Sequence, residues 1–79
     1  MPTDDHSREV QQHRWDVGAR IRMLRLAAEL SQVQLAERAG LDHRTISRAE
    51  RGQHAISIDV AYRIASGLGE PTWRLFRDA

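Results

Sequence analysis

Hydrogen-bond donors recur at helical spacing between residues 43 and 48. Arg44 and Arg48 are four positions apart, so both side chains would lie on one face of a helix. His43 and Ser47 share that face. A guanidinium can donate two hydrogen bonds to O6 and N7 of guanine in a major groove, whereas serine and neutral histidine make less specific contacts. Exposed helix faces also carry charge without binding anything, and that alternative stays open.

A short helix over residues 32–39 precedes these donors. Ser31 can cap it, because a serine hydroxyl accepts a hydrogen bond from a free backbone N–H of the first turn. Gln34, three positions later, completes a capping box. Gly40 suits the left-handed residue that ends such a helix.

A second short helix, over about residues 43–50, would carry the donors themselves. Asp42 can cap its start and Gly52 can end it. Ile46 and Ala49 fall on the opposite face from the donors and are expected to point inward. The two capped helices face each other across a tight turn.

Amphipathic helices flank this pair. Upstream, Val17, Ile21, Leu24 and Ala28 mark one face of a helix that begins near Asp16. Downstream, Ser57 can cap a fourth helix. Its expected inward residues are Ile58, Ala61, Ile64, Ala65 and Leu68.

The chain ends in a predicted fifth helix over about residues 71–77, with Pro71 in its first turn. Trp73 and Phe76 are expected to anchor this helix by packing, and Leu75 would project on another side. Hydrophobic side chains on several faces of a short helix exceed what one seam can cover. The residues Trp73, Leu75 and Phe76 are therefore a candidate dimer interface.

Residues 1–14 are predicted to form a flexible N-terminal arm, because Val10 is the one strong hydrophobe there besides Met1. Two alternatives stay open. Residues 7–15 could extend the first helix upstream, or Val10 and Trp15 could fold back on the domain, which is predicted to span residues 15–79.

The composition describes one small domain. The chain has 79 residues, 41% hydrophobic and 29% charged, with no cysteine, so disulfides and thiolate metal sites are excluded. No apolar run approaches the roughly 20 residues needed to span a bilayer, and the N-terminus lacks the pattern of a signal peptide. We expect a cytoplasmic protein.

Positive charge is concentrated in residues 17–52. That segment holds seven arginines against four acidic residues, whereas residues 1–16 hold two arginines against four acidic residues. Residues 53–79 hold three of each. A surplus of positive charge on the helical pair is what a phosphate-facing surface requires.

No set of residues indicates catalysis. The chain has no cysteine nucleophile, no glycine-rich phosphate loop and no paired metal ligands. Of the four histidines, His6 and His13 lie in the predicted arm, and His43 and His54 are 11 positions apart without an obvious partner ligand. We expect no enzymatic activity, no metal and no cofactor.

The capped pair resembles the helix-turn-helix of the phage-repressor-like DNA-binding family (Cro/cI, xenobiotic-response-element or XRE type), found in bacteria and phages. The resemblance covers roughly residues 17–76. It is carried by Ser31-Gln32, Leu35-Ala36, Ala39-Gly40-Leu41, Thr45-Ile46-Ser47 and Glu50-Arg51-Gly52. The resemblance implies an all-α fold, a compact five-helix lambda-repressor-like domain with the helix-turn-helix at its second and third helices.

The resemblance also assigns roles to single residues. It implies a phosphate contact for Gln32 and a structural ion pair between Arg25 and Glu50. Arg51 and His54 could contact phosphate beside the recognition helix. The complete predicted DNA-binding set is Gln32, Asp42, His43, Arg44, Thr45, Ser47, Arg48, Arg51 and His54.

The function that follows is sequence-specific binding of double-stranded DNA by a nucleoid-associated transcriptional regulator, expected to be a repressor. A homodimer on a palindromic operator is implied, because one small module buries only about 600–1,000 Å² on DNA. The rival interpretation is a protein-interaction module or antitoxin-like component. Its partner would be another protein, such as a toxin or an inducer-binding subunit.

Overall fold

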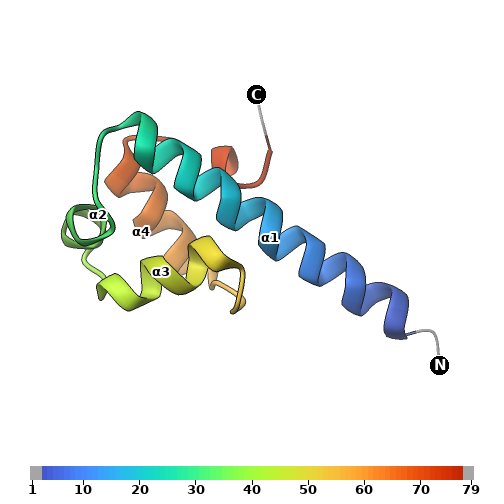
Figure 1. The fold of residues 1–79 in the computed structure, drawn as a ribbon. Helices are drawn as coiled ribbons and strands as arrows, with labels where there is room; N and C mark the ends of the chain where they lie inside the picture. Colours follow the sequence, from blue (N-terminus) through green and yellow to red (C-terminus); the bar gives the residue numbers. More distant parts are fainter. Residues whose placement is uncertain (1–2, 78–79) are drawn as a thin grey trace.

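This computed structural model describes residues 3–77, which form four α-helices and one short 3-10 helix joined by loops (Figure 1). They are α1 (Thr3–Ala27), α2 (Gln32–Ala39), α3 (His43–Arg51), α4 (Ile58–Leu68) and the 3-10 helix η1 (Thr72–Leu75). The all-α class and the helix-turn-helix at α2 and α3 are confirmed. The predicted count of five helices is wrong, because the last one is a single 3-10 turn.

The predicted caps fix the ends of α2. The backbone N–H of Gln34 donates to the Ser31 hydroxyl over 3.0 Å, and the Gln34 side-chain oxygen accepts from the Ser31 N–H over 2.8 Å. Both halves of the capping box are therefore present. Gly40 ends the helix with a φ of 69°, a left-handed conformation that glycine adopts without steric cost.

The core lies where the four helices meet. α1 packs on α3, and α2 packs on both α3 and α4. The fully buried large side chains are Ile21, Leu35, Ile46, Ile64 and Leu75, at least one from each element. Each α-helix supplies the inward residues that its periodicity predicts, with two exceptions. Ala28 lies just after the end of α1 and is exposed, and Ile58 is described below.

Gly18 allows α1 and α3 to approach closely. A Cβ atom placed on Gly18 would lie 2.5 Å from the carbonyl oxygen of Ala49 and 2.6 Å from that of Glu50. Those oxygens belong to backbone, which cannot swing aside as a flexible side chain can. Glycine at this position therefore sets the distance between α1 and the C-terminal end of the recognition helix.

The N-terminal segment differs from the flexible arm predicted for residues 1–14. Residues from Thr3 onward continue α1, and this end of the helix projects beyond the rest of the domain (Figure 1). The alternative of an upstream helical extension fits better, and the extension begins earlier than predicted. Two contacts hold it: Gln11 Nε2 donates to the Gly52 carbonyl over 3.0 Å, and the His13 ring stacks on Phe76. Residues 1 and 2 of the predicted arm lie outside the described residues.

Leu75 reverses the prediction made for the end of the chain. Its side chain is fully buried, whereas Trp73 and Phe76 are 44% and 40% exposed. A 3-10 helix has three residues per turn, so Thr72 and Leu75 share a side and the core-facing position falls on Leu75. Leu75 is part of the core and is not available to a dimer interface.

Ile58 is a second correction. It was expected to point inward with Ala61 and Ile64, but its side chain is 85% exposed while theirs are buried. Ile58 is the first residue of α4, in a turn that extends past the core. Two hydrophobes of α1, Met23 and Leu26, are likewise about half exposed, at 50% and 53%.

Candidate nucleic-acid interface

The outer face of α3 presents its polar side chains to solvent. His43, Arg44 and Arg48 are exposed, and Ser47 is half-buried at the edge of that face. Ile46 and Ala49 on the opposite face are buried, as predicted. The helix is therefore held by one face and presents two exposed guanidinium groups on the other.

Asp42 fixes where α3 begins. Its carboxylate accepts a hydrogen bond from the Arg44 N–H over 2.8 Å and lies 3.7 Å from the Arg44 Nε. The hydrogen bond from the Arg44 backbone lowers the pKa of Asp42 below its usual value. The carboxylate is exposed, so it serves as a charged cap at the edge of the candidate interface.

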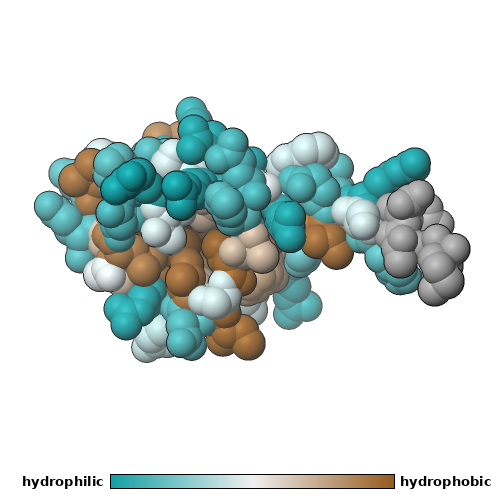
Figure 2. All heavy atoms as spheres, turned by 90° about the horizontal axis from the view of Figure 1, so that it is seen from below, coloured by the Kyte–Doolittle hydropathy of each residue, from teal (hydrophilic) through white to brown (hydrophobic). Residues whose placement is uncertain are grey.

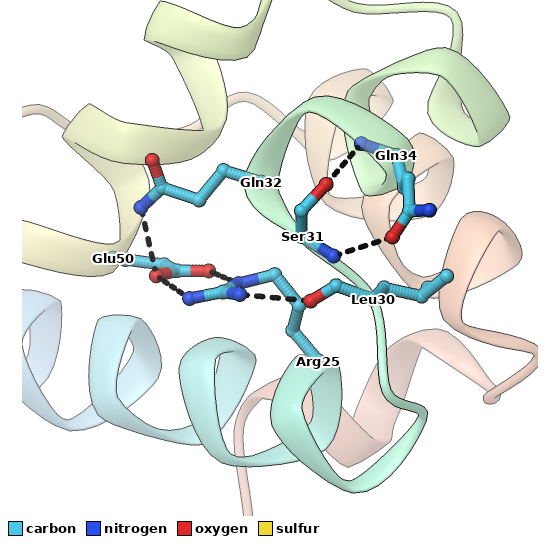
Figure 3. Close-up of polar contacts among 6 residues, drawn as sticks. All are labelled: Arg25, Leu30, Ser31, Gln32, Gln34 and Glu50. Atoms are coloured by element: carbon cyan, nitrogen blue, oxygen red, sulfur yellow. Dashed lines mark hydrogen bonds and ion pairs between the residues drawn. The ribbon is translucent and has the colours of Figure 1, made fainter.

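Behind that face, the Arg25–Glu50 pair predicted from the resemblance is present and buried (Figure 3). Arg25 Nε and Nη2 donate to the two carboxylate oxygens of Glu50 over 2.5 Å and 3.0 Å. The exposed fractions of the two side chains are 9% and 3%. The hydrogen bond to Glu50 raises the pKa of Arg25 although burial opposes it, so the guanidinium stays charged at neutral pH.

The same pair connects three helices. Arg25 Nη1 donates to the Leu30 carbonyl over 2.8 Å, so the guanidinium also holds the segment that leads into α2. Gln32, the first residue of α2, donates from Nε2 to Glu50 Oε1 over 3.1 Å (Figure 3). Glu50 thus receives donors from α1 and α2 and fixes the C-terminal end of α3 relative to both.

The structure gives Gln32 a structural role beside the predicted phosphate contact. Its side chain is half-buried, with the amide nitrogen on Glu50 instead of open to solvent. Gln32, which was predicted to contact phosphate, therefore also links α2 to the C-terminal end of α3. A phosphate contact by Gln32 stays a prediction.

The remaining predicted site residues fall into two places. Arg51 is exposed at the end of α3, in line with the outer face. Thr45 is half-buried and lies with His54 in a hollow between α3 and the loop that precedes α4. The outer face thus gathers most of the predicted set, and Thr45 and His54 sit to one side of it.

Sequence reasoning missed two residues that support this interface, Gly18 and Gln11. An isolated glycine inside a helical pattern is a known signal of close backbone approach, so Gly18 could have been found. Gln11 carried no signal, because its partner Gly52 lies 41 positions away in the chain.

Among the described residues, no group of three His, Asp or Glu side chains is placed to hold a metal ion. None of the described helices is both long enough and apolar enough to cross a membrane.

A capped recognition helix that packs on a second capped helix, with arginines on its exposed face, defines a DNA-binding helix-turn-helix domain. Comparison with known proteins gives the same class. A helix-turn-helix family profile matches residues 21–73, more than half of the chain. The chain belongs to this family and is a DNA-binding helix-turn-helix transcription regulator of the XRE type.

Its relatives include bacterial and archaeal proteins. An uncharacterized transcriptional regulator in the ATPase CF(0) region of Rhodospirillum rubrum is 37% identical over 78 residues, which is 99% of this chain and 71% of that protein. An uncharacterized HTH-type transcriptional regulator of Methanothermobacter thermautotrophicus is 35% identical over 60 residues, 76% of this chain and 71% of that protein.

Among solved structures, the restriction-modification controller protein C.AhdI from Aeromonas hydrophila is similar. It superimposes with a TM-score of 0.78 at 36% sequence identity, over 80% of this chain and 96% of that one. The fold and the position of the helix-turn-helix are therefore shared with a protein that controls a restriction-modification system.

Proposed function

We propose that this protein is a sequence-specific repressor of transcription that binds a palindromic operator as a homodimer. The observation that carries the proposal is the free outer face of α3, with Arg44 and Arg48 exposed on a helix whose other face is buried. An α-helix fits the major groove of B-form DNA, where each base pair presents a distinct pattern of donors and acceptors.

In this arrangement Arg44 and Arg48 read base edges, and residues at the margins hold the phosphates. Arg51 lies about one helical turn beyond Arg48 and is exposed at the end of α3. Gln32 stands in the first turn of α2, where free backbone N–H groups and the helix dipole favour an anion. Backbone contacts set the register of the protein on the duplex, and base contacts supply specificity.

For the homodimer we propose a different surface from Trp73, Leu75 and Phe76, because Leu75 is buried. Ile58 is 85% exposed at the start of α4, and Tyr62, one turn later, is 64% exposed. Pairing two copies through this patch would present two recognition helices to one duplex. A palindromic operator requires those helices about 34 Å apart. Repression then needs only occupancy of the operator, without a cofactor or a catalytic step.

Selection of bound duplexes from a random DNA pool tests the proposal. We expect the wild-type protein to enrich a palindrome with two half-sites about one helical turn apart. Arg44→Ala and Arg48→Ala should each weaken binding to that sequence by about 1–3 kcal/mol and relax the preference at one or two base pairs. Arg22→Ala, an exposed arginine on α1 away from the outer face of α3, is the matched control.

Two outcomes would contradict the assignment. A loss that is uniform across all sequences would move that arginine from base reading to phosphate contact. An unenriched pool, with a folded protein, would favour the rival function, a module whose partner is another protein such as a toxin or an inducer-binding subunit.

A further inference from the structure

An open groove lies between the N-terminal half of α1 and the loop over residues 53–57. Its volume is about 490 Å³, within the range of roughly 300–1,000 Å³ that is typical of small-molecule sites. Val10 and Val17 of α1 form one wall, Ile56 of the loop forms the other, and Phe76 closes one end. The function proposed above makes no use of this groove.

The groove keeps hydrophobic surface in contact with solvent. Val10 is 50% exposed and Phe76 is 40% exposed, although both lie beside buried core residues. Figure 2 shows hydrophobic side chains gathered over the middle of the underside of the molecule and again at the base of the projecting end of α1. An apolar occupant of the groove would cover this surface and gain the corresponding hydrophobic free energy.

Arg14 supplies a charged group for a ligand in the groove. It lines the groove, and its Nε atom is buried without a hydrogen-bond partner among the described residues. Glu9, the acidic residue at the groove, is exposed and lies 3.7 Å from His6 instead. Buried donors in native proteins nearly always have an acceptor, and an unmet charged donor is costly. A carboxylate in the groove would pair with the Arg14 guanidinium through a charge-assisted hydrogen bond. The Nε atom itself is buried, so this donor is met when the side chain turns toward the groove.

We propose that this groove binds a small hydrophobic monocarboxylate. The carboxylate accepts from the guanidinium of Arg14, and the apolar body lies between Val10 and Ile56 with one end against Phe76. The histidines nearby, His6, His13 and His54, do not turn the groove into a metal site, because no suitable group of three ligands occurs among the described residues.

The groove also adjoins the DNA-binding elements. Ala49 of α3 and His54, a predicted phosphate contact, line it. Gly52, which ends α3, packs so closely on α1 that an added Cβ would lie 2.7 Å from Trp15 Cδ1. An occupant would therefore touch the loop that leaves the recognition helix, and its negative charge would offset Arg14. Carboxylate binding should weaken DNA binding, a step that rests on the proposed function.

Calorimetric titration of the full chain with 2-naphthoate tests the site, with 2-naphthamide as the uncharged analogue. We expect naphthoate to bind at least about tenfold more tightly than the amide, the difference that one charge-assisted hydrogen bond supplies. Arg14→Gln should remove that preference. Arg22→Gln, an exposed arginine of α1 that does not line the groove, should keep it.

A second variant keeps the test independent of Arg14. Val10→Glu puts a negative charge at a half-exposed position in the groove, so the fold should survive while naphthoate binding falls by tenfold or more. Far-ultraviolet circular dichroism checks that each variant is folded. Equal affinities for acid and amide, unchanged affinity in Arg14→Gln, or no binding at millimolar naphthoate would overturn the proposal. So would a second copy of the chain that fills the groove, seen as dissociation of a dimer by Val10→Glu.

Fluorescence anisotropy with a labelled mixed-sequence duplex tests the link to DNA. We expect saturating naphthoate to weaken duplex binding by at least threefold in the wild type and to have no effect in Arg14→Gln. If naphthoate binds the free protein but leaves its affinity for the duplex unchanged, the coupling to DNA binding is overturned and the ligand site in the groove stands. Failure of the naphthoate-free protein to bind any duplex would instead count against the proposed function.

Discussion

Glu50 illustrates how one residue can fix the geometry of a recognition helix. Its carboxylate receives two hydrogen bonds from Arg25 and one from Gln32, so side chains of α1 and α2 meet at the last turn of α3. These hydrogen bonds lie behind the outer face of α3. Their effect on DNA binding is to hold that face at one angle, because a helix tied at its end cannot rotate about its axis.

Removing one partner of the Arg25–Glu50 pair should be strongly destabilising. Arg25→Leu or Glu50→Leu leaves a buried charge without its counter-ion, for which we expect a loss of about 3–5 kcal/mol in the free energy of unfolding, measured with urea. The double variant strands no charge and should be more stable than either single variant. Losses under about 1 kcal/mol in the single variants would show that the pair behaves like an exposed one.

At the scale of helices, the sequence predicted the elements that are specified locally. The capping residues gave the bounds of α2 as residues 32–39, and those bounds are confirmed. The cap at Ser57 is also confirmed, and α3 ends one residue later than predicted. Caps act within three residues of their partners, so a single sequence contains the whole interaction.

Elements held by distant contacts were predicted poorly. The start of α1 is a polar sequence with little local signal, and its contacts reach Gly52 and Phe76, far away in the chain. The terminal turn was predicted with α-helical periodicity, which placed Leu75 on the wrong side. Only the packing of η1 against α1 and α4 shows that Leu75 points inward.

The contact between α1 and α3 leads to a second prediction. Gly18→Ala should destabilise the domain by about 1–3 kcal/mol, because the added methyl group would meet two backbone carbonyl groups of α3 and push the helices apart. Ala19→Gly, at the exposed neighbouring position, measures the propensity effect of glycine in this helix and should cost about 0.5–1 kcal/mol. If Gly18→Ala stabilised the fold by a similar amount, the close approach would be excluded.

The cap of α3 should make stability depend on pH. The pKa of Asp42 is lower in the folded state than in the unfolded chain, so the folded state keeps this carboxylate charged to a lower pH. The contribution of Asp42 is therefore complete above the unfolded pKa of about 4 and is lost as the pH falls through the folded value. Asp42→Asn can cap the helix without titrating.

Urea unfolding of the wild type and Asp42→Asn at a series of pH values measures this effect. The stability of the wild type relative to Asp42→Asn should fall on acidification below about pH 4 and stay constant above about pH 5. A constant difference throughout would show that the carboxylate charge does not matter to the cap.

At the scale of the whole molecule, function depends on surfaces that the core leaves uncovered. The outer face of α3 could be predicted from spacing alone, because the donors and the buried residues of one helix alternate with a fixed period. The groove beside α1 could not, since three segments distant in sequence form it. Leu75 was assigned to a dimer interface, and Ile58 to the core, for the same reason: the burial of Leu75 and the exposure of Ile58 both depend on where the core ends.

Ile58 and Tyr62 form an exposed hydrophobic patch at the start of α4. Ile58 is among the most exposed of the hydrophobic side chains, and a soluble domain seldom presents isoleucine so openly beside an exposed tyrosine unless something covers them. Two-fold pairing would make the contact self-complementary, since the same patch serves both copies.

We expect sedimentation equilibrium at tens of micromolar to give twice the monomer mass of 9.0 kDa for the wild type. Ile58→Asp should give the monomer mass and retain the helical circular dichroism spectrum, because its side chain supports no core residue. Met23→Asp, half-exposed on α1, should remain dimeric. Because a monomer engages a single half-site, Ile58→Asp should also lose most of its affinity for a palindrome while keeping its affinity for a half-site. A wild-type monomer at these concentrations, or an Ile58→Asp dimer, would place the interface elsewhere or remove it.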